Sequence, residues 1–274
     1  YFKELCNFYN VSAFDGAEFN INDIPKIGKT ALIMLSQSGE TKDLHRCIQI
    51  GRTEKCFIIG VVNVVDSMIA RESDCGCYIN SGREVGVAST KSFTNQLLLL
   101  NMMAIYFSKL QNININLIKK YIYNLHNLPN DIKKTINICQ DNKDNLVKIL
   151  NKRSVFILGK GKYQHISNEG ALKIKELSYI HAEGYSGSSL KHGPFALLDR
   201  NALTILLIDE KNTESLTSTF YEISSRDTHC CIITDNESLN IKSEIFLKLP
   251  KLPHYQELIF SIALQYLSYV LSIS

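Results

Sequence analysis

Short, purely apolar runs recur along this chain, and each one ends at a polar loop that leads into a helical stretch. The clearest run covers residues 31–35 and stops at a Ser- and Gly-rich loop, which a helical pattern over 42–51 follows. A strand that is apolar on both faces is typical of parallel sheets covered by helices on both sides. The alternation therefore predicts an α/β fold.

This alternation occurs twice, on either side of an Asn-rich, turn-prone segment at residues 111–116. We expect a first subdomain over 1–114, a helical bridge over 115–145 and a second subdomain over 146–274. A faint internal repeat relates the run 30–36 to the run 204–209. Further strands are predicted over 56–62, 76–80, 154–158, 202–208, 230–234 and 245–249. Further helices are predicted over 66–71, 91–110, 117–138, 141–151, 163–181, 213–225 and 257–271.

Composition narrows the class of partner. The 274 residues carry a net charge of +3 with scattered basic residues, which argues against nucleic acid or an acidic membrane as main partner. Apolar runs such as 56–62 are too short to cross a bilayer. The eight cysteines include no C-x-x-C pair, so we expect no metal site and a reducing, cytoplasmic location. The chain opens at Tyr1 without a basic-then-apolar leader, and we expect a fragment or a processed product.

The loop that follows the first apolar run reads SQSGET over residues 36–41. In open α/β sheets, ligands bind where strands end and helix N-termini offer free N–H groups and a positive dipole end. The loop adds hydroxyl donors and one amide, and its glycine permits close approach of the backbone. These residues are Ser36, Gln37, Ser38, Gly39 and Thr41. The set either wraps a dianionic phosphate or forms an ordinary helix cap.

A second polar loop, residues 82–96, also enters a helix. Ser89 and Thr90 are candidate caps for that helix. Lys91 in the first turn opposes the helix dipole, so this lysine needs a local partner. The loop either closes over the same ligand as residues 36–41 or simply starts the helix.

Two features of the second half are candidates for proton transfer. Glu169, Lys173 and Glu176 recur at i, i+4 and i+7, so they share one helix face. They form either an acid–base stripe that lines a cleft or a surface Glu/Lys ladder. His192 lies in the Gly/Pro-punctuated loop 184–194, where it is either aimed at a substrate or an exposed loop histidine.

Four long motifs in register resemble one family closely. The runs SQSGETKDL, EVGVASTKSFTNQ, EGALKIKELSYIHAEGY and LKHGPFALLD cover most of residues 32–199. They are similar, in order and spacing, to the isomerase half of the glutamine–fructose-6-phosphate aminotransferases, also called glucosamine-6-phosphate synthases. The resemblance implies two sugar-isomerase (SIS) subdomains, each a flavodoxin-like parallel sheet flanked by helices. It also implies conversion of fructose 6-phosphate, with ammonia from glutamine, to glucosamine 6-phosphate, without a metal or cofactor.

The resemblance also assigns roles to residues. The family's phosphate and sugar contacts fall on Ser36, Gln37, Ser38, Thr41, Val87 and Ser89. The family's catalytic glutamate, which moves a proton between C1 and C2, falls on Glu176, with a supporting lysine at Lys173. The histidine linked to ring opening falls on His192. In the family a neighbouring subunit supplies that histidine, so the resemblance implies at least a homodimer.

Three departures from the family pattern matter. This sequence begins downstream of the family's Cys-Gly-Thr-Ser turn, so the first strand is expected to be missing, and it stops before the Asn-Leu-Ala-Lys tail whose lysine forms a Schiff base. The family's glutaminase domain is not in the sequence either. Ser188 and Ser189 replace a Gly-Glu pair next to the histidine loop. The isolated chain is therefore expected to bind the sugar phosphate weakly without turnover.

Two other functions stay open at this point. One is a different SIS enzyme, such as a sugar-phosphate deaminase or a deglycase. The other is a SIS module that binds a sugar phosphate without chemistry.

Overall fold

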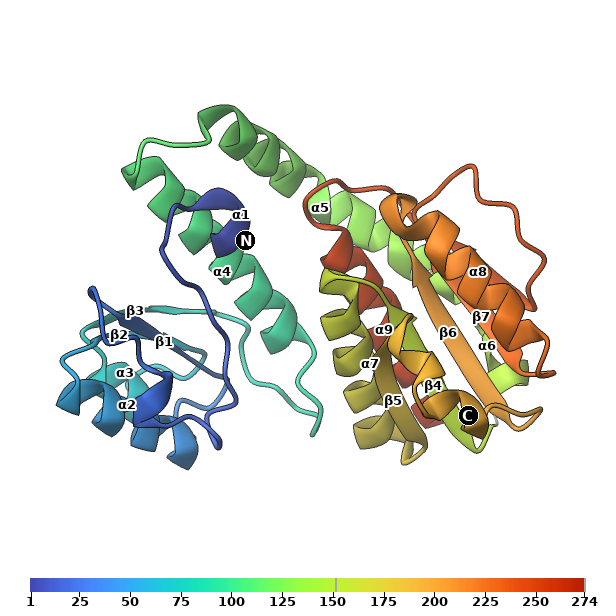
Figure 1. Cartoon of the computed structure of the whole chain (residues 1–274), viewed down its shortest axis with the longest axis horizontal. Coiled ribbons are helices and arrows are strands. Elements are labelled where there is room, and N and C mark those ends of the chain that lie inside the picture. Colours follow the sequence, from blue (N-terminus) through green and yellow to red (C-terminus); the bar gives the residue numbers. More distant parts are fainter. Residues whose placement is uncertain (151, 274) are drawn as a thin grey trace. The chain divides into compact units, whose positions relative to one another are not determined.

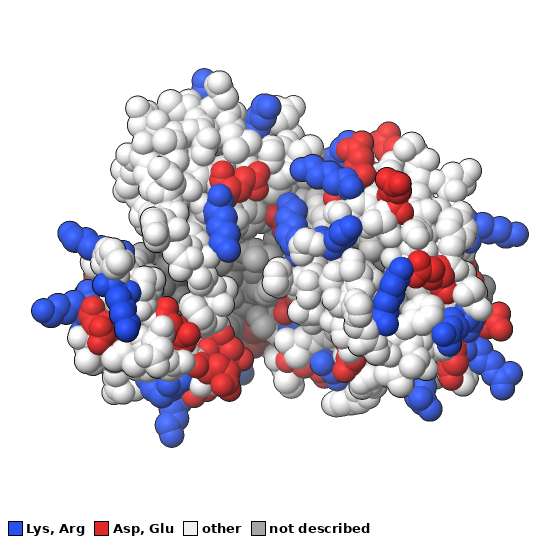
Figure 2. Space-filling model, in the orientation of Figure 1, with Lys and Arg blue, Asp and Glu red and all other residues white. Residues whose placement is uncertain are grey.

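The computed structural model describes residues 1–150 and 152–273, and these form two compact units that divide between residues 119 and 120 (Figure 1). Each unit contains an all-parallel sheet covered by helices, which confirms the predicted α/β class. Asn151, the predicted end of the helix 141–151, lies outside the described residues. Acidic and basic side chains are interspersed over each unit on the face that Figure 2 shows.

The first unit is built on a three-stranded sheet in the order β1 (Ala31–Ser36), β2 (Phe57–Val62) and β3 (Cys75–Tyr78). Alternate residues of β2 pack on opposite faces, because successive side chains of a strand point in opposite directions. Ile58 and Val62 join one apolar cluster with α2 (Lys42–Thr53) and α3 (Met68–Glu72). Ile59 and Val61 join another with α4 (Lys91–Leu110). The short helices α1 (Phe2–Leu5) and η1 (Ile21–Asp23) precede the sheet.

The long helix α5 (Ile115–Asp141) begins in the first unit and continues in the second, where α6 (Lys143–Leu150) follows. The second unit holds a five-stranded parallel sheet in the order β5-β4-β6-β7-β8. Its strands are β4 (Ser154–Gly159), β5 (His181–Ser186), β6 (Ala202–Ile208), β7 (His229–Thr234) and β8 (Ile245–Lys248). Its helices are α7 (Lys162–Ser178), η2 (Ser189–Lys191), η3 (Pro194–Leu197), η4 (Glu210–Asn212), α8 (Thr213–Ser224) and α9 (Gln256–Ile273).

Both faces of the second sheet are covered. Helices α7 and α9 pack side by side, and α8 lies over β6 and β7 within a separate apolar cluster (Figure 1). All seven residues of β6 are buried, as its continuous apolar pattern predicts. The order β6-β7-β8 repeats the order β1-β2-β3, which supports the internal repeat between runs 30–36 and 204–209.

Helix α9 is the one described helix that is long and apolar enough to cross a membrane by length and composition. Within the fold 61 % of it is buried, and its buried side chains run along most of its length. Packing in the core of the second unit therefore accounts for its apolar composition.

Two sequence predictions about element boundaries are wrong. The helix predicted to reach residue 181 ends at Ser178, because Tyr179 adopts a left-handed conformation with φ 59°. The chain then enters β5, a strand at the edge of the sheet that lies partly in the predicted loop 184–194. Helix α2 also continues past Gly51, because this glycine packs closely on β1 and β2 instead of ending the helix. A Cβ atom there would lie 2.6 Å from Leu32 Cδ1.

Candidate functional site

Hydrogen bonds to the side chain of Ser36, at the end of β1, organise the loop 36–41. Ser36 Oγ accepts a hydrogen bond from the Gly39 N–H (2.9 Å) and shares another with Thr41 Oγ1 (2.8 Å). Ser38 Oγ accepts from the Glu40 N–H at 3.2 Å. Gly39 has φ +69°, in the left-handed region that favours glycine. Thr41 then begins α2 as its N-cap residue, so the loop surrounds a helix N-terminus.

The start of α3 holds this loop from outside. The Ile69 N–H donates to the Gly39 carbonyl (3.0 Å), and the Met68 N–H donates to Glu40 Oε1 (2.8 Å). Ser67 is buried directly against Gly39. The Glu40 carboxylate is therefore occupied as a helix cap, and contacts from α3 hold the loop in place.

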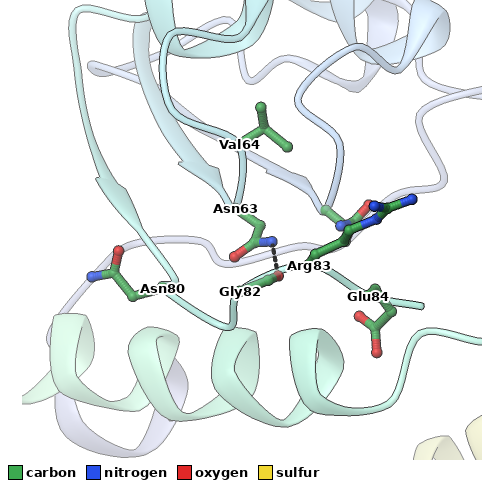
Figure 3. Close-up of a pocket in the computed structure, with 7 residues that line it drawn as sticks. Asn63, Val64, Asn80, Gly82, Arg83 and Glu84 are labelled. Atoms are coloured by element: carbon green, nitrogen blue, oxygen red, sulfur yellow. Dashed lines mark hydrogen bonds between the residues drawn. The ribbon is translucent and has the colours of Figure 1, made fainter. Parts of the chain in front are cut away.

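A pocket of about 520 Å³ opens at the carboxyl end of this sheet (Figure 3). Each of the three strands is followed within two residues by a lining residue: Gln37 after β1, Asn63 after β2 and Asn80 after β3. The full lining is Gln37, Asn63, Val64, Asn80, Gly82, Arg83 and Glu84. The pocket lies where open α/β sheets bind ligands, and it includes one residue of the predicted phosphate loop.

The segment after β3 is anchored by Glu84, the first residue of the run EVGVASTKSFTNQ, to which the sequence assigned no role. Its carboxylate accepts hydrogen bonds from Thr90 N–H (2.9 Å), from Thr90 Oγ1 (3.2 Å) and from the Ser92 hydroxyl. Burial alone favours the protonated acid, but the hydrogen bonds from Ser92 and Thr90 outweigh it and lower the pKa of Glu84. Glu84 thereby caps α4 and ties the pocket wall to that helix.

Two further sequence predictions fall on this segment. Lys91 has the local partner that was expected, because its ammonium donates to the Arg83 carbonyl at 2.7 Å. Ser89 Oγ donates to Glu84 at 3.4 Å, and the side chain of Val87 is 90 % exposed. Neither residue lines the pocket.

In the second unit, the face of α7 that carries Glu169, Lys173 and Glu176 is not a surface ladder. The side chain of Lys173 is 3 % exposed, and its ammonium lies 2.6 Å from Glu176 Oε2 and 3.5 Å from Glu169 Oε1. Burial raises the pKa of Glu169, an effect that Lys173 opposes and Glu176 reinforces. A lysine held between two carboxylates in a partly buried site is an arrangement suited to proton transfer.

His192 follows η2, on the loop after β5, and is exposed. Among the described residues it makes no hydrogen bond or ion pair with Lys173 or Glu176. Ser188 is the N-cap residue of η2 without a side-chain cap hydrogen bond, and Lys191 pairs with Glu222 at 2.8 Å. The structure thus brings the lysine and the two glutamates together, and leaves the histidine facing solvent.

Sequence reasoning also missed a buried carboxylate pair at the carboxyl end of the second sheet. Asp209 follows β6 and Asp235 follows β7, and they are 4 % and 6 % exposed. Burial and the neighbouring Asp209 raise the pKa of Asp235 to about 6, against a hydrogen bond from the Glu210 N–H. The signal was available, since each aspartate directly ends an apolar run. The described residues contain no group of three or more His, Cys, Asp or Glu side chains placed to hold a metal ion.

Comparison with known proteins identifies the family. The SIS domain model matches residues 6–106 and 148–274. The solved C-terminal domain of glucosamine-fructose-6-phosphate aminotransferase from Francisella tularensis superimposes with a TM-score of 0.83 at 31 % identity, over 92 % of this chain and 75 % of that one. The chain belongs to the glutamine–fructose-6-phosphate aminotransferase family. It corresponds to the SIS part of these enzymes.

Curated aminotransferases of this family are similar in sequence to most or all of this chain. A probable glutamine–fructose-6-phosphate aminotransferase of Acanthamoeba polyphaga mimivirus is 41 % identical over 280 residues, all of this chain and 45 % of that protein. The Aquifex aeolicus aminotransferase is 35 % identical over 86 % of this chain and 39 % of its own length. The chain thus spans less than half the length of these relatives.

More distant structures share the fold alone. A glucosamine-6-phosphate deaminase from Thermotoga maritima superimposes with a TM-score of 0.72 at 20 % identity, over 94 % of this chain and 75 % of that one. The double-SIS architecture is therefore common to this aminotransferase family chain and to a deaminase, and the fold does not distinguish the two activities.

Proposed function

We propose that this chain is the sugar-phosphate-binding and isomerising part of an enzyme that makes glucosamine 6-phosphate from fructose 6-phosphate and ammonia released from glutamine. The observation that carries the proposal is the 41 % identity over the whole chain to a probable aminotransferase of this reaction. The anchored loop 36–41, at a strand end beside a pocket, supports it independently.

In the proposed reaction, Ser36, Gln37, Ser38 and Thr41 bind the 6-phosphate through hydroxyl, amide and helix N–H donors, and Val87 and Ser89 contact the sugar. Ammonia condenses with the C2 carbonyl and releases water. Glu176 then takes a proton from C1 and returns one to C2, while the proton of the C1 hydroxyl passes to the nitrogen, which converts the C2 imine to the amine and C1 to the aldehyde. Such a general base supplies roughly 10²–10⁴-fold in rate. Lys173, 2.6 Å from that carboxylate, stabilises its ionised form.

The assembly follows from the same proposal. His192 assists ring opening in the active site of a neighbouring subunit, which requires at least a homodimer and accounts for its exposure here. A glutaminase domain supplies ammonia in the full-length protein, which is cytoplasmic and needs no cofactor. The domain boundaries proposed from the sequence are 1–114 and 146–274, with residues 115–145 as a bridge.

Isothermal titration of the purified chain with fructose 6-phosphate tests the binding half of the proposal. Binding is expected, and fructose without the phosphate should bind far more weakly. The chemistry is tested in the full-length protein, where Glu176→Gln should abolish glucosamine 6-phosphate formation while fructose 6-phosphate still binds. Lys175→Gln, on an exposed position of the same helix, is the control and should retain activity. Unchanged synthesis by the Glu176 variant would reject the assigned role.

Two other outcomes would replace this proposal. Ammonia release from glucosamine 6-phosphate without synthesis from glutamine would identify a deaminase. Sugar-phosphate binding without either reaction in the full-length protein would identify a non-catalytic SIS module.

A further inference from the structure

We propose that Arg83 is a phosphate-binding residue of the first unit and makes its pocket selective for dianionic sugar phosphates. This inference rests on the proposed function. Arg83 lines the same pocket as Gln37 of the phosphate loop. The loop 36–41 itself contains hydroxyl, amide and backbone donors but no basic side chain. A dianion held by neutral donors alone keeps its full charge, and a planar guanidinium beside it supplies paired, charge-assisted hydrogen bonds.

The backbone that carries Arg83 is held on both sides. The Asn63 side-chain amide donates to the Gly82 carbonyl at 2.7 Å, as the dashed line in Figure 3 marks. The Lys91 ammonium donates to the Arg83 carbonyl at 2.7 Å, and Glu84 is fixed to the start of α4. Because these hydrogen bonds hold the backbone, the position of the guanidinium depends only on the side-chain torsions of Arg83.

The guanidinium itself remains available. Within residues 1–150 and 152–273, the Arg83 side chain makes no hydrogen bond or ion pair. The carboxylate of the adjacent Glu84 forms no ion pair with it among the described residues and instead accepts hydrogen bonds from Thr90 and Ser92. Figure 3 shows the two side chains leaving the loop in different directions, with Glu84 toward α4 and Arg83 away from that helix.

The other arginines of the first unit are all engaged. Arg46 donates to the carbonyls of Gly16 and Ala17, Arg52 pairs with Asp74 at 2.6 Å, and Arg71 donates to the Asp66 carbonyl. Arg83 thus differs from them in having, among the described residues, no hydrogen-bond partner for its guanidinium at the wall of a pocket. A guanidinium without partners at a pocket wall is expected where an anionic ligand accepts its hydrogen bonds.

The test is titration calorimetry of the whole chain with fructose 6-phosphate and with inorganic phosphate. Arg83→Gln should weaken binding of both about tenfold, equivalent to about 1.4 kcal/mol. It should also reduce the loss of affinity between 50 and 300 mM NaCl, roughly the range over which screening grows. Arg83→Lys keeps the positive charge but lacks the planar guanidinium. Its affinity should therefore lie between those of the unmodified chain and Arg83→Gln. Arg200→Gln removes the same charge from an exposed turn of the second unit and should bind like the unmodified chain.

The outcomes separate the two proposals. If the unmodified chain and both Arg83 variants bind fructose 6-phosphate equally, the role of Arg83 is wrong and the proposed function stands. If the unmodified chain and Arg200→Gln bind no sugar phosphate, the proposed function fails and the role of Arg83 fails with it. Equal weakening by the Arg200 and Arg83 variants would also overturn the proposal, because the effect would then reflect net charge.

Discussion

The shape of the phosphate loop depends on the absence of a side chain at position 39. Gly39 has φ +69°, and a Cβ atom placed there would lie 2.0 Å from Ser67 Oγ and 2.4 Å from Ser67 Cβ. Ser67 is 2 % exposed at the start of α3 and has no room to withdraw. The variant Gly39→Ala therefore cannot keep both the loop and the α3 contact in place.

Two terms set the size of the effect. An alanine in the left-handed region costs about 1–2 kcal/mol relative to glycine. Overpacking against a buried neighbour adds about 1–3 kcal/mol. We expect Gly39→Ala to lower the free energy of unfolding of the first unit by about 2–5 kcal/mol, the sum of these terms, and to weaken fructose 6-phosphate binding at least tenfold.

The chain offers a matched control in Gly28, which has φ +89° and nothing within 4 Å of an added Cβ. Gly28→Ala should show the conformational term alone, about 1–2 kcal/mol. Adding Ser67→Gly to Gly39→Ala should recover the steric part, since the Ser67 hydroxyl has no hydrogen-bond partner in the described part of the chain. Urea denaturation followed by circular dichroism measures each value. Equal destabilisation by the two alanine variants, or no recovery in the double variant, would refute the steric argument.

Three further predictions concern charged groups. Lys173→Met should lower the free energy of unfolding by about 2–4 kcal/mol, because it leaves two acidic neighbours beside each other without their cation, whereas Lys175→Met on the exposed face should change it little. Burial raises the pKa of Asp235 from 3.8 to about 6, so the folded state binds this proton more tightly than the unfolded state does. The free energy of unfolding should therefore fall by about 3 kcal/mol between pH 4 and pH 6 and then level off. Asp235→Asn should abolish that decline in denaturation curves measured across this range. Glu84→Gln should cost the first unit about 1–2 kcal/mol at pH 7, because an amide caps Thr90 less strongly than a carboxylate, and thermal unfolding measures it.

The elements whose boundaries the sequence predicts are those whose apolar pattern begins and ends with the element. Helix α4 and strand β6 have the boundaries that the sequence predicts, 91–110 and 202–208, because their apolar patterns start and stop with the structure. Strand β5 was missed because its sequence, HAEGYS, lacks an apolar run; its place at the sheet edge leaves it only partly buried. Its pairing with β4 depends on tertiary contacts that no local pattern records.

The candidate site likewise has parts that the sequence predicts and parts that it does not. Within the loop 36–41, the hydrogen bonds of Ser36 join residues at most five apart, so the sequence carries that part of its shape. The hydrogen bonds from Met68 and Ile69 to the loop are long-range, and no local pattern records them. The burial of Lys173 arises from packing around α7, and the residues alone favoured a surface ladder. Glu84 opens the run EVGVASTKSFTNQ, but no role was assigned to it, and its hydrogen bonds to Thr90 and Ser92 at the start of α4 were not foreseen.

The buried helix α9 has a consequence for synthesis of the chain. It is the last element of the second unit in chain order, and twelve of its residues are buried. Until α9 has left the ribosome, the surface of α7 that packs against it is uncovered. The first unit, whose strands and helices lie close together in sequence, can fold while synthesis continues, whereas the second unit must wait. Nascent chains paused before α9 should therefore be the species that chaperones bind and that aggregate most readily.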